Sequence, residues 1–371
     1  MNSLFLKMTL SDRRTQALLL SGLLSLIALA VVGWLSPQGT VAGSPASIRA
    51  AERMSRAIEV VRSMYTRLGF QFDDAVDPNN TGLIGEEYTE ITTTLGNVEA
   101  KRTTTNPAMA GMMVRLLEEA GVVAGDTIAV GCSGSFPAMA IATLAAAEAL
   151  EVTPLLVVSL GASSYGATHK EMTLLDILEA LKRENVIVHS PMAASLGGAD
   201  DVGNEFEPEV KEILLAKIRQ SGVPVLYEPD LQKNVAQRLQ IYFGPSGLRR
   251  VTVFVNIGGN YADLGTSPLI LKIEPGVNKS VEIPQESEKH GVVFAMANRH
   301  IPVIHVLNIR ELALKYVMPW DPIPLPGVNA ATMSDAPIAL TSPAGIVVVV
   351  YLILLAAILV GYRDAFSRIP T

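Results

Sequence analysis

Two uncharged apolar runs, one near each end of the chain, restrict this sequence more than any other feature. The first covers residues 17–35 and the second covers residues 345–362. A helix needs about 20 apolar residues to cross the hydrocarbon core of a bilayer, and both runs are close to that length. A cleaved signal peptide is the alternative for the first run, but its apolar stretch exceeds the roughly 7–15 residues usual for signal peptides. We therefore predict a transmembrane helix in each run.

Basic residues outside these two runs predict the orientation of the chain. Cationic residues concentrate on the cytoplasmic side of spanning helices. We therefore expect residues 1–16 and 363–371 in the cytoplasm, and everything between the spans outside the cytoplasm at the cell membrane. The residues concerned are Lys7, Arg13 and Arg14 before the first run, with Arg363 and Arg368 after the second.

Composition divides the part between the spans into three segments. Residues 36–50 follow the first span as a short linker, and residues 51–317 read as ordinary globular sequence. Residues 318–344 are rich in proline and small side chains, which is typical of an extended tether. We therefore predict one globular domain, at residues 51–317, held outside the cytoplasm between two anchors.

The globular segment alternates between helical and extended patterns. Its strands are apolar and β-branched without polar alternation, as a parallel sheet buried on both faces requires. The predicted fold class is α/β, with a doubly wound, mostly parallel sheet in a Rossmann-like three-layer arrangement. The expected strands are residues 91–94, 127–130, 155–159, 186–189, 223–227, 251–256 and 303–307. The expected helices are residues 51–68, 108–120, 138–150, 173–183, 208–220, 231–243, 292–298 and 309–317.

Charge and cysteine content exclude several classes of protein. The formal net charge is −7 and no block of lysine and arginine is present, so we expect no nucleic-acid partner. The single cysteine, Cys132, leaves no internal disulfide, and no cysteine and histidine cluster has the spacing of a zinc site. Neither a dinucleotide fingerprint nor a phosphate-binding P-loop occurs. We therefore predict no metal and no cofactor.

Residues 131–137, Gly-Cys-Ser-Gly-Ser-Phe-Pro, lie between an expected strand and an expected helix. Small residues with free amides at a helix start suit a carboxylate or a phosphate. Three interpretations stay open for this loop: a turn without a ligand, an anion site, or a nucleophilic serine at Ser133 or Ser135. The candidate ligand-binding residues here are Gly131, Ser133, Gly134 and Ser135.

Three further loops lie beside expected strands or helix starts, where α/β proteins bind ligands. In each, an ordinary polar loop or helix cap is the alternative to a binding role. Paired glycines after the strand at residues 251–256 would let a ligand approach the backbone closely. The candidates are Lys101, Arg102 and Asn106 before one helix, Ser163 and Ser164 after one strand, and Asn256, Gly258, Gly259 and Asn260 after another.

A serine–histidine–acid triad is a further possibility, but the order of residues in the sequence cannot select its members. Histidines at strand ends are more often structural than catalytic. The candidates are Ser133 with His169, His189, His300 or His305 and with Asp176 or Asp200.

A family resemblance lies in three stretches, NNTGLIGEEYTEITTTLGNVEAKRTTTNPAMAG, GDTIAVGCSGSFPAMAIATLAAAEAL and VVSLGASSYGAT. They resemble the poly-γ-glutamate system protein family, over about residues 51–308. Members of that family are membrane-anchored proteins associated with the ligase and membrane subunits that make and export γ-linked polyglutamate. The resemblance implies a role in synthesis, export or attachment of this anionic capsule polymer. It supplies no catalytic residues.

Two functional hypotheses follow from the sequence, beside the alternative of a scaffold whose loops bind no ligand. The first is an accessory component that binds the polymer or organises the ligase and membrane subunits. The second is a membrane-tethered hydrolase or transferase acting on γ-glutamyl amide bonds, with Ser133 or Ser135 as its nucleophile. Because the chain is acidic overall, any site for a polyanion must be local and depend on backbone amides or on Lys101 and Arg102.

Overall fold

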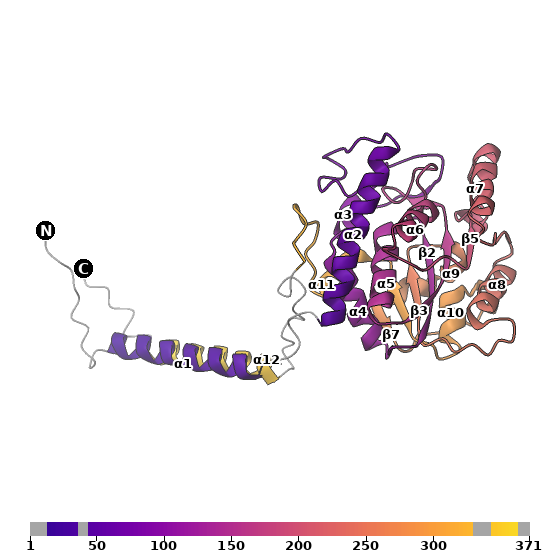
Figure 1. The fold of residues 1–371 in the computed structure, drawn as a ribbon. Coiled ribbons are helices and arrows are strands. Elements are labelled where there is room, and N and C mark those ends of the chain that lie inside the picture. Colours follow the sequence, from indigo (N-terminus) through magenta and orange to yellow (C-terminus); the bar gives the residue numbers. More distant parts are fainter. Residues whose placement is uncertain (1–12, 36–43, 329–342, 363–371) are drawn as a thin grey trace. The chain divides into compact units, whose positions relative to one another are not determined.

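The computed structural model describes residues 13–35, 44–328 and 343–362 (Figure 1). The chain forms two compact units, one of Met1–Val41 with Asp335–Thr371 and the other of Ala42–Ser334. The predicted cytoplasmic segments, residues 1–16 and 363–371, lie outside the described residues except for residues 13–16, which belong to the first helix.

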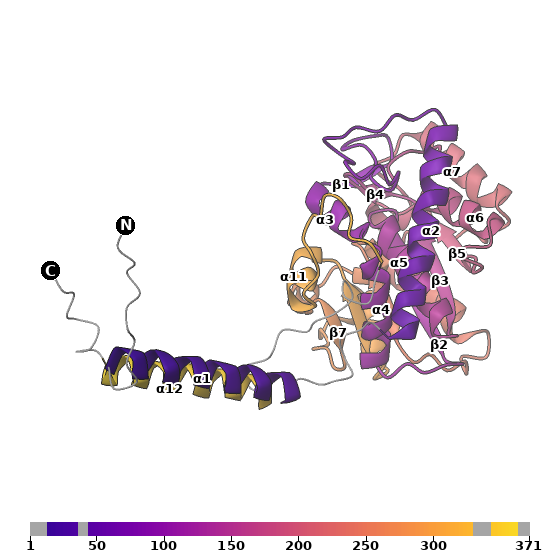
Figure 2. The ribbon, with the colours of Figure 1, turned by 60° about the vertical axis from the view of Figure 1, so that its left-hand side comes forward.

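Two apolar helices, α1 (Arg13–Leu35) and α12 (Pro343–Gly361), make up the first unit. They lie side by side in Figures 1 and 2, and the Ser25 Oγ is 3.1 Å from the Tyr351 hydroxyl oxygen. Both helices expose large apolar side chains, including Leu29 and Val360, which is costly in water.

Only α1 meets the length and hydropathy expected of a membrane-crossing helix, within the described residues. Its apolar window is Thr15–Val32, and a signal sequence near the N-terminus would meet the same standard. The apolar part of α12, Gly345–Gly361, is shorter. One spanning helix is therefore possible by length and composition, and the second span stays a prediction.

The globular unit contains a six-stranded sheet in the order β5-β3-β2-β6-β8-β7. All neighbouring pairs are parallel except β7 with β8, which is antiparallel at one edge. The predicted mostly parallel α/β sheet is thus confirmed. A separate parallel pair joins β1 to β4. The strands are β1 (Thr92–Thr94), β2 (Thr127–Ser133), β3 (Thr153–Ser159), β4 (Ala162–Ser163), β5 (Ala193–Ser195), β6 (Phe254–Ile257), β7 (Gly276–Asn278) and β8 (Val303–Val306).

Helices cover both faces of the sheet and produce three layers (Figure 1). Alternate residues of a strand face opposite layers. Along β2, Val130 and Cys132 join the core formed with α2, α4, α5 and α6, whereas Ala129 joins the core formed with α8 and α10. The helices are α2 (Pro45–Arg67), α3 (Val98–Thr104), α4 (Ala108–Glu119), α5 (Pro137–Ala149), α6 (Leu174–Arg183), α7 (Pro208–Gln220), α8 (Leu231–Phe243), α9 (Tyr261–Leu264), α10 (Val292–Ala297) and α11 (Ile309–Lys315).

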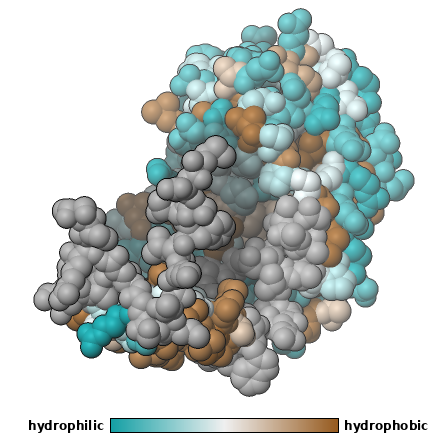
Figure 3. Space-filling view, turned by 90° about the vertical axis from the view of Figure 1, so that its left-hand side faces the viewer, coloured by the Kyte–Doolittle hydropathy of each residue, from teal (hydrophilic) through white to brown (hydrophobic). Residues whose placement is uncertain are grey.

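Helix α5 is buried on nearly all sides because it lies between the sheet and the outer helices α2 and α4. Its many alanines allow this close packing, since a methyl group keeps neighbouring backbones near each other. Helix α2 presents Met54, Ile58 and Val61 to it at the three- and four-residue spacing of one helical face. By contrast, the described surface of the domain in view in Figure 3 is mostly hydrophilic, with scattered apolar side chains.

Several sequence predictions require correction. Residues 186–189 form no strand; Ile187 packs in the core, and the edge strand β5 begins later, at Ala193. Residues 223–227 contribute only an isolated bridge between Val225 and Ala194. A short apolar run can be buried as a strand or as an irregular segment, so periodicity alone does not distinguish a strand from a buried loop. The edge strand β7 was not predicted.

The predicted linker and tether are both shorter than expected. Ser44 caps α2, which begins at Pro45, inside the predicted linker 36–50. The predicted tether 318–344 starts on the domain itself, because Arg102 pairs with Asp321 and Asn79 hydrogen-bonds Pro322 and Leu325. Residues 318–328 therefore form a strap that belongs to the globular unit.

Candidate functional site

A cavity of about 740 Å³ lies at the carboxyl ends of the parallel strands. From β2 the sheet extends through β3 to β5 on one side and through β6 to β8 on the other. This reversal between β2 and β6 is the topological switch point, where open α/β sheets bind their ligands. The cavity walls include Ser133 and Ser135 at the end of β2, Ser159 and Ser163 at and after β3, Gly259 and Asn260 after β6, and Asn308 after β8.

The structure brings about half of the sequence candidates together at this cavity. Those that line it are Lys101, Ser133, Ser135, Ser163, Gly259 and Asn260. They come from α3, β4 and the loops after β2 and β6, so four segments distant in the sequence meet at one place.

The remaining candidates have other partners. Arg102 forms a two-pronged pair with Asp321, at 2.7 and 2.6 Å, so its charge is already neutralised. Asn106 accepts a hydrogen bond from the Ala108 N–H at the start of α4. Three glycines lie against polar groups: Gly131 against the Asp263 carboxylate, Gly134 against the Leu160 carbonyl and Gly258 against the Ser133 hydroxyl. Ser164 donates a hydrogen bond to the Thr94 carbonyl. Asn256 hydrogen-bonds His305.

Lys101 lies in a short helix, α3, and not in a polar loop, which was the alternative that the sequence left open. Asn97 caps α3 by accepting a hydrogen bond from the Ala100 N–H. Gly96 lets α3 approach β4, because a Cβ atom there would come within 2.5 Å of the Ser164 carbonyl oxygen. Since Thr94 of β1 is the register partner of Ser163 in β4, the β1–β4 pair places Lys101 directly beside Ser163.

The Lys101 side chain is buried, with 2% of its surface exposed. Its Nζ donates to the Ser163 Oγ at 2.7 Å and to the Ser135 carbonyl oxygen, and it lies 4.0 Å from the centre of the Phe136 ring. No carboxylate is within ion-pair distance of this Nζ in the described part of the chain. Burial lowers the pKa of Lys101 to about 7, so both protonation states are populated near neutrality.

The serines around Lys101 are held in fixed positions. The Ser135 Oγ accepts a hydrogen bond from the Ser163 N–H at 3.0 Å. The Ser133 Oγ receives a long contact, 3.4 Å, from the Ser135 N–H, and Gly258 has a positive φ directly against it. Of these three hydroxyls, only that of Ser163 hydrogen-bonds the amine.

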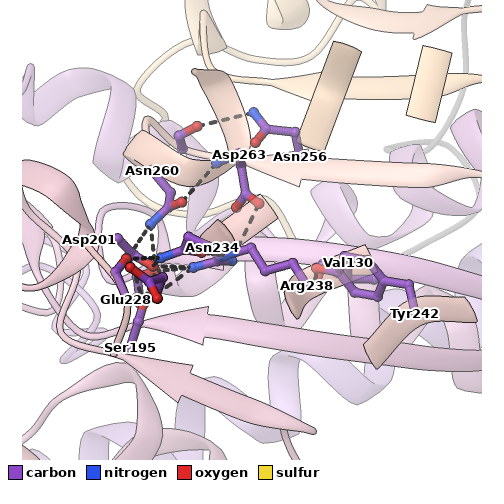
Figure 4. A network of polar contacts seen from close by, with 12 residues as sticks. Val130, Ser195, Asp201, Glu228, Asn234, Arg238, Tyr242, Asn256, Asn260 and Asp263 are labelled. Atoms are coloured by element: carbon purple, nitrogen blue, oxygen red, sulfur yellow. Dashed lines mark hydrogen bonds and ion pairs between the residues drawn. The ribbon is translucent and has the colours of Figure 1, made fainter. Parts of the chain in front are cut away.

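A second buried cluster is centred on Arg238 (Figure 4). The Arg238 guanidinium is fully buried and is 2.7 Å from an Asp201 oxygen and 3.4 Å from an Asp263 oxygen. Asp201 also accepts hydrogen bonds from Ser195, Asn234 and Asn260. The buried Arg238 and its ion pairs thus link β5, α8 and the loops around α9 to one another.

This cluster supports part of the cavity wall. The Asn260 amide donates to the Ser159 Oγ at 2.6 Å and to Asp201 at 2.8 Å, and both Asn260 and Ser159 line the cavity. Asp201 has a left-handed backbone, with φ of 62°, which is unfavourable outside glycine and persists because its contacts hold it. Burial raises the pKa of Asp263 to about 6 despite Arg238 nearby.

The Arg238 cluster was not predicted from the sequence. A signal was present, because the buried stripe of α8 carries Asn234 and Arg238 among Leu231, Val235 and Tyr242. Two polar residues in an otherwise apolar stripe indicate a buried polar partner elsewhere in the fold.

The histidines form no catalytic triad with a serine. All five are described, and none lines the cavity or hydrogen-bonds a serine. His305 pairs with Asn256, and burial lowers its pKa to about 4, so its ring stays neutral. His169 stacks on Phe70 with 4.2 Å between ring centres.

Comparisons of the chain with protein-family models, with curated proteins and with solved structures found no match. A buried amine without a carboxylate partner can act in two ways: as a cation it binds an anion, and as a neutral amine it accepts a proton.

Proposed function

We propose that this chain is a membrane-anchored accessory component of a poly-γ-glutamate synthesis or export system, and that its α/β domain binds the γ-glutamyl chain in the cavity. The observation that carries the proposal is the buried Lys101, which lacks a carboxylate partner in the described residues. Leaving a buried charge unpaired is unfavourable, so a carboxylate from a ligand would stabilise the cationic form.

The character of the cavity supports a polar, multidentate ligand. Hydroxyl groups of Ser133, Ser135 and Ser163 and the amides of Asn260 and Asn308 lie around it. A γ-glutamyl chain repeats a carboxylate and an amide in every unit, and both groups hydrogen-bond with such side chains. Two cations, the buried Lys101 and the exposed Arg310, line the cavity together with Glu205. Such local positive charge agrees with the acidic composition, which disfavours an extended basic groove.

Both apolar helices are included in the proposal as spans, with both termini cytoplasmic and the domain extracytoplasmic. Helix α12 has 19 residues, and at ~1.5 Å per residue it is roughly 28 Å long, close to the ~30 Å of a bilayer core. Its contact with α1 through Ser25 and Tyr351 supports a paired anchor. The ligase and membrane subunits are the proposed partners of this pair.

Binding of short γ-linked glutamate oligomers to the full chain in detergent, measured by calorimetry, tests the binding site. We expect Lys101→Met to weaken affinity at least about tenfold, equivalent to ~1.4 kcal/mol. Wild-type affinity should fall from pH 6 to pH 8, because Lys101 loses its proton through pH about 7 while glutamate stays ionised. The variant should lack this pH dependence.

The matched control is Lys233→Met, which removes an exposed lysine on α8 and should leave binding unchanged. An α-linked oligomer of equal charge measures selectivity for the γ-linkage. Equal affinity of wild type and Lys101→Met would refute the site, and absence of binding at millimolar oligomer would refute the proposed ligand.

A further inference from the structure

We propose that Ser163 and Lys101 form a serine–lysine catalytic pair that transfers γ-glutamyl acyl groups, with Ser163 as nucleophile and Lys101 as general base. The γ-glutamyl identity of the acyl group rests on the proposed function. The pair itself rests on geometry: 2.7 Å between the Ser163 Oγ and the Lys101 Nζ, at the wall of the cavity.

Several features of the site match the requirements of such a base. A serine hydroxyl attacks a carbonyl only when a neighbouring group takes its proton. A lysine does this only when uncharged, and burial of Lys101 favours its neutral form near neutral pH. The absence of a nearby carboxylate in the described residues matters here, because an acidic partner would hold the lysine in its cationic form.

Contacts of the other cavity serines leave Ser163 as the nucleophile. Neither the Ser133 nor the Ser135 hydroxyl bonds to Lys101 or to a histidine in the described chain; Lys101 reaches Ser135 only at its backbone carbonyl. Ser135 instead orients Ser163 by accepting its N–H. We therefore propose Ser163 as the nucleophile in place of the sequence candidates Ser133 and Ser135.

The reaction proceeds in two balanced steps. The Ser163 Oγ bonds to the carbonyl carbon of the γ-amide while its proton passes to the Lys101 Nζ, and the C–N bond then breaks as that proton moves to the leaving amine. A γ-glutamyl ester of Ser163 results. Water or another amine then attacks the ester carbonyl, Lys101 again carries the proton to the departing Ser163 oxygen, and a free acid or a new amide is released.

The start of α5 provides a means of stabilising the oxyanion of each tetrahedral intermediate. Helix α5 begins at Pro137, directly after Ser135 and Phe136, which both line the cavity. Pro137 has no N–H, and the Met139 and Ala140 amides donate to the Phe136 carbonyl, so the contribution of this helix start is its dipole, which favours negative charge there. The dipole suits both a ligand carboxylate and a developing oxyanion.

The two roles of Lys101 have opposite pH dependences. Its cationic form binds a carboxylate below pH about 7, and its neutral form activates Ser163 above that pH. We therefore expect oligomer affinity to fall and turnover to rise between pH 6 and pH 8. A purely structural Lys101–Ser163 contact would produce no ascending rate profile.

The experiment uses the full chain in detergent with γ-glutamyl-p-nitroanilide as chromogenic substrate and a γ-linked tetraglutamate for binding. Ser163→Ala should lower the release of nitroaniline at least about 100-fold, the usual effect of losing nucleophile activation, and still bind the oligomer. Lys101→Arg keeps a cation but cannot act as a base, so it should also lose turnover while binding oligomer.

A matched control exists in the same chain. Lys182 and Ser190 form a surface pair with the same 2.7 Å Nζ–Oγ distance, remote from the cavity lining. Ser190→Ala should therefore leave turnover and its pH profile unchanged.

A second measurement covers the case in which Ser163→Ala does not fold. The wild-type chain is treated with an activated γ-glutamyl ester, quenched and digested, and mass spectrometry locates the acyl group. Attachment at Ser163 supports the pair, and attachment only at another residue overturns it. If the wild-type chain binds the oligomer but does not turn over the substrate, the catalytic pair alone is overturned. If the wild-type chain neither binds nor turns over, the proposed function is overturned as well.

Discussion

Lys101 shows how an environment changes the chemistry of one residue. In water its amine would remain charged at any physiological pH, but in this fold it is desolvated and surrounded by a carbonyl, a hydroxyl and an aromatic ring. Desolvation penalises the charged form, whereas these three partners offset only part of that cost. The same side chain can consequently serve as an anion ligand or as a base.

Burial of Lys101 predicts a pH dependence of stability. Its folded-state pKa of about 7 lies below its ordinary value of 10.5, so between these pH values the unfolded chain binds a proton that the folded chain does not. Stability should therefore rise with pH in this window, by at most ~1.4 kcal/mol per pH unit, and be lowest below pH 7.

Urea unfolding of the full chain at pH 7, 8 and 9, followed by circular dichroism, measures this slope. Lys101→Met should have a flatter profile than wild type, because methionine does not titrate. Parallel profiles in the two proteins would show that Lys101 keeps its proton in the folded state.

At the scale of elements, the Arg238 cluster connects parts of the fold that no ladder of hydrogen bonds joins. Helix α8 supplies Arg238 and Asn234, while Asp201 and Asp263 come from the short helical segments around residues 199–201 and 261–264. These loops follow β5 and β6 and carry the cavity wall. Through Arg238 and Asp201, helix α8 therefore helps to orient the side chains of Asn260 and Ser159.

Arg238→Met should destabilise the domain by about 3–5 kcal/mol, because it leaves two buried carboxylates without their cation. Asp263 already has a raised pKa, so its folded form takes up a proton more readily than its unfolded form. Stability therefore falls as pH rises through about 4 to 6, and the variant should recover stability at pH 5 relative to pH 8.

Thermal or urea unfolding of both proteins at pH 5 and pH 8 checks this prediction. The control, Arg183→Met, removes an exposed arginine from the last turn of α6 and should change the free energy of unfolding by less than about 0.5 kcal/mol. If Arg238→Met lowers the free energy of unfolding by as little as the control does, the cluster does not stabilise the fold.

At the scale of the whole molecule, the proposed anchoring determines which molecules the cavity can meet. Leu248 is 84% exposed on the domain, and the only cysteine, Cys132, is buried. In Leu248→Cys, a membrane-impermeant maleimide should label intact cells if the domain is extracytoplasmic. Ser3→Cys, in the proposed cytoplasmic segment, should be labelled only after lysis. The reverse pattern would refute the proposed topology.

Much of the framework followed from local sequence. Helices α7 and α8 begin and end at the predicted residues, 208–220 and 231–243, and the buried strands β2, β3, β6 and β8 were all expected. The alternation of strands and helices predicted ligand sites in loops beside strand ends, whereas the strand order that puts the switch point between β2 and β6 came from the tertiary structure. Edge elements were predicted poorly, since β5 and β7 have three residues each and too little pattern to detect.

The sequence by itself therefore determined the layered α/β architecture, the apolar ends and the set of loops that could form a binding site, because periodicity and capping depend on neighbouring residues. Only the tertiary structure decided which loops meet. Lys101 and Ser163 are 62 residues apart, and Arg238 and Asp201 are 37 apart. Whether a lysine is a solvated charge or a buried base depends on what surrounds it in space, and no local pattern records that environment.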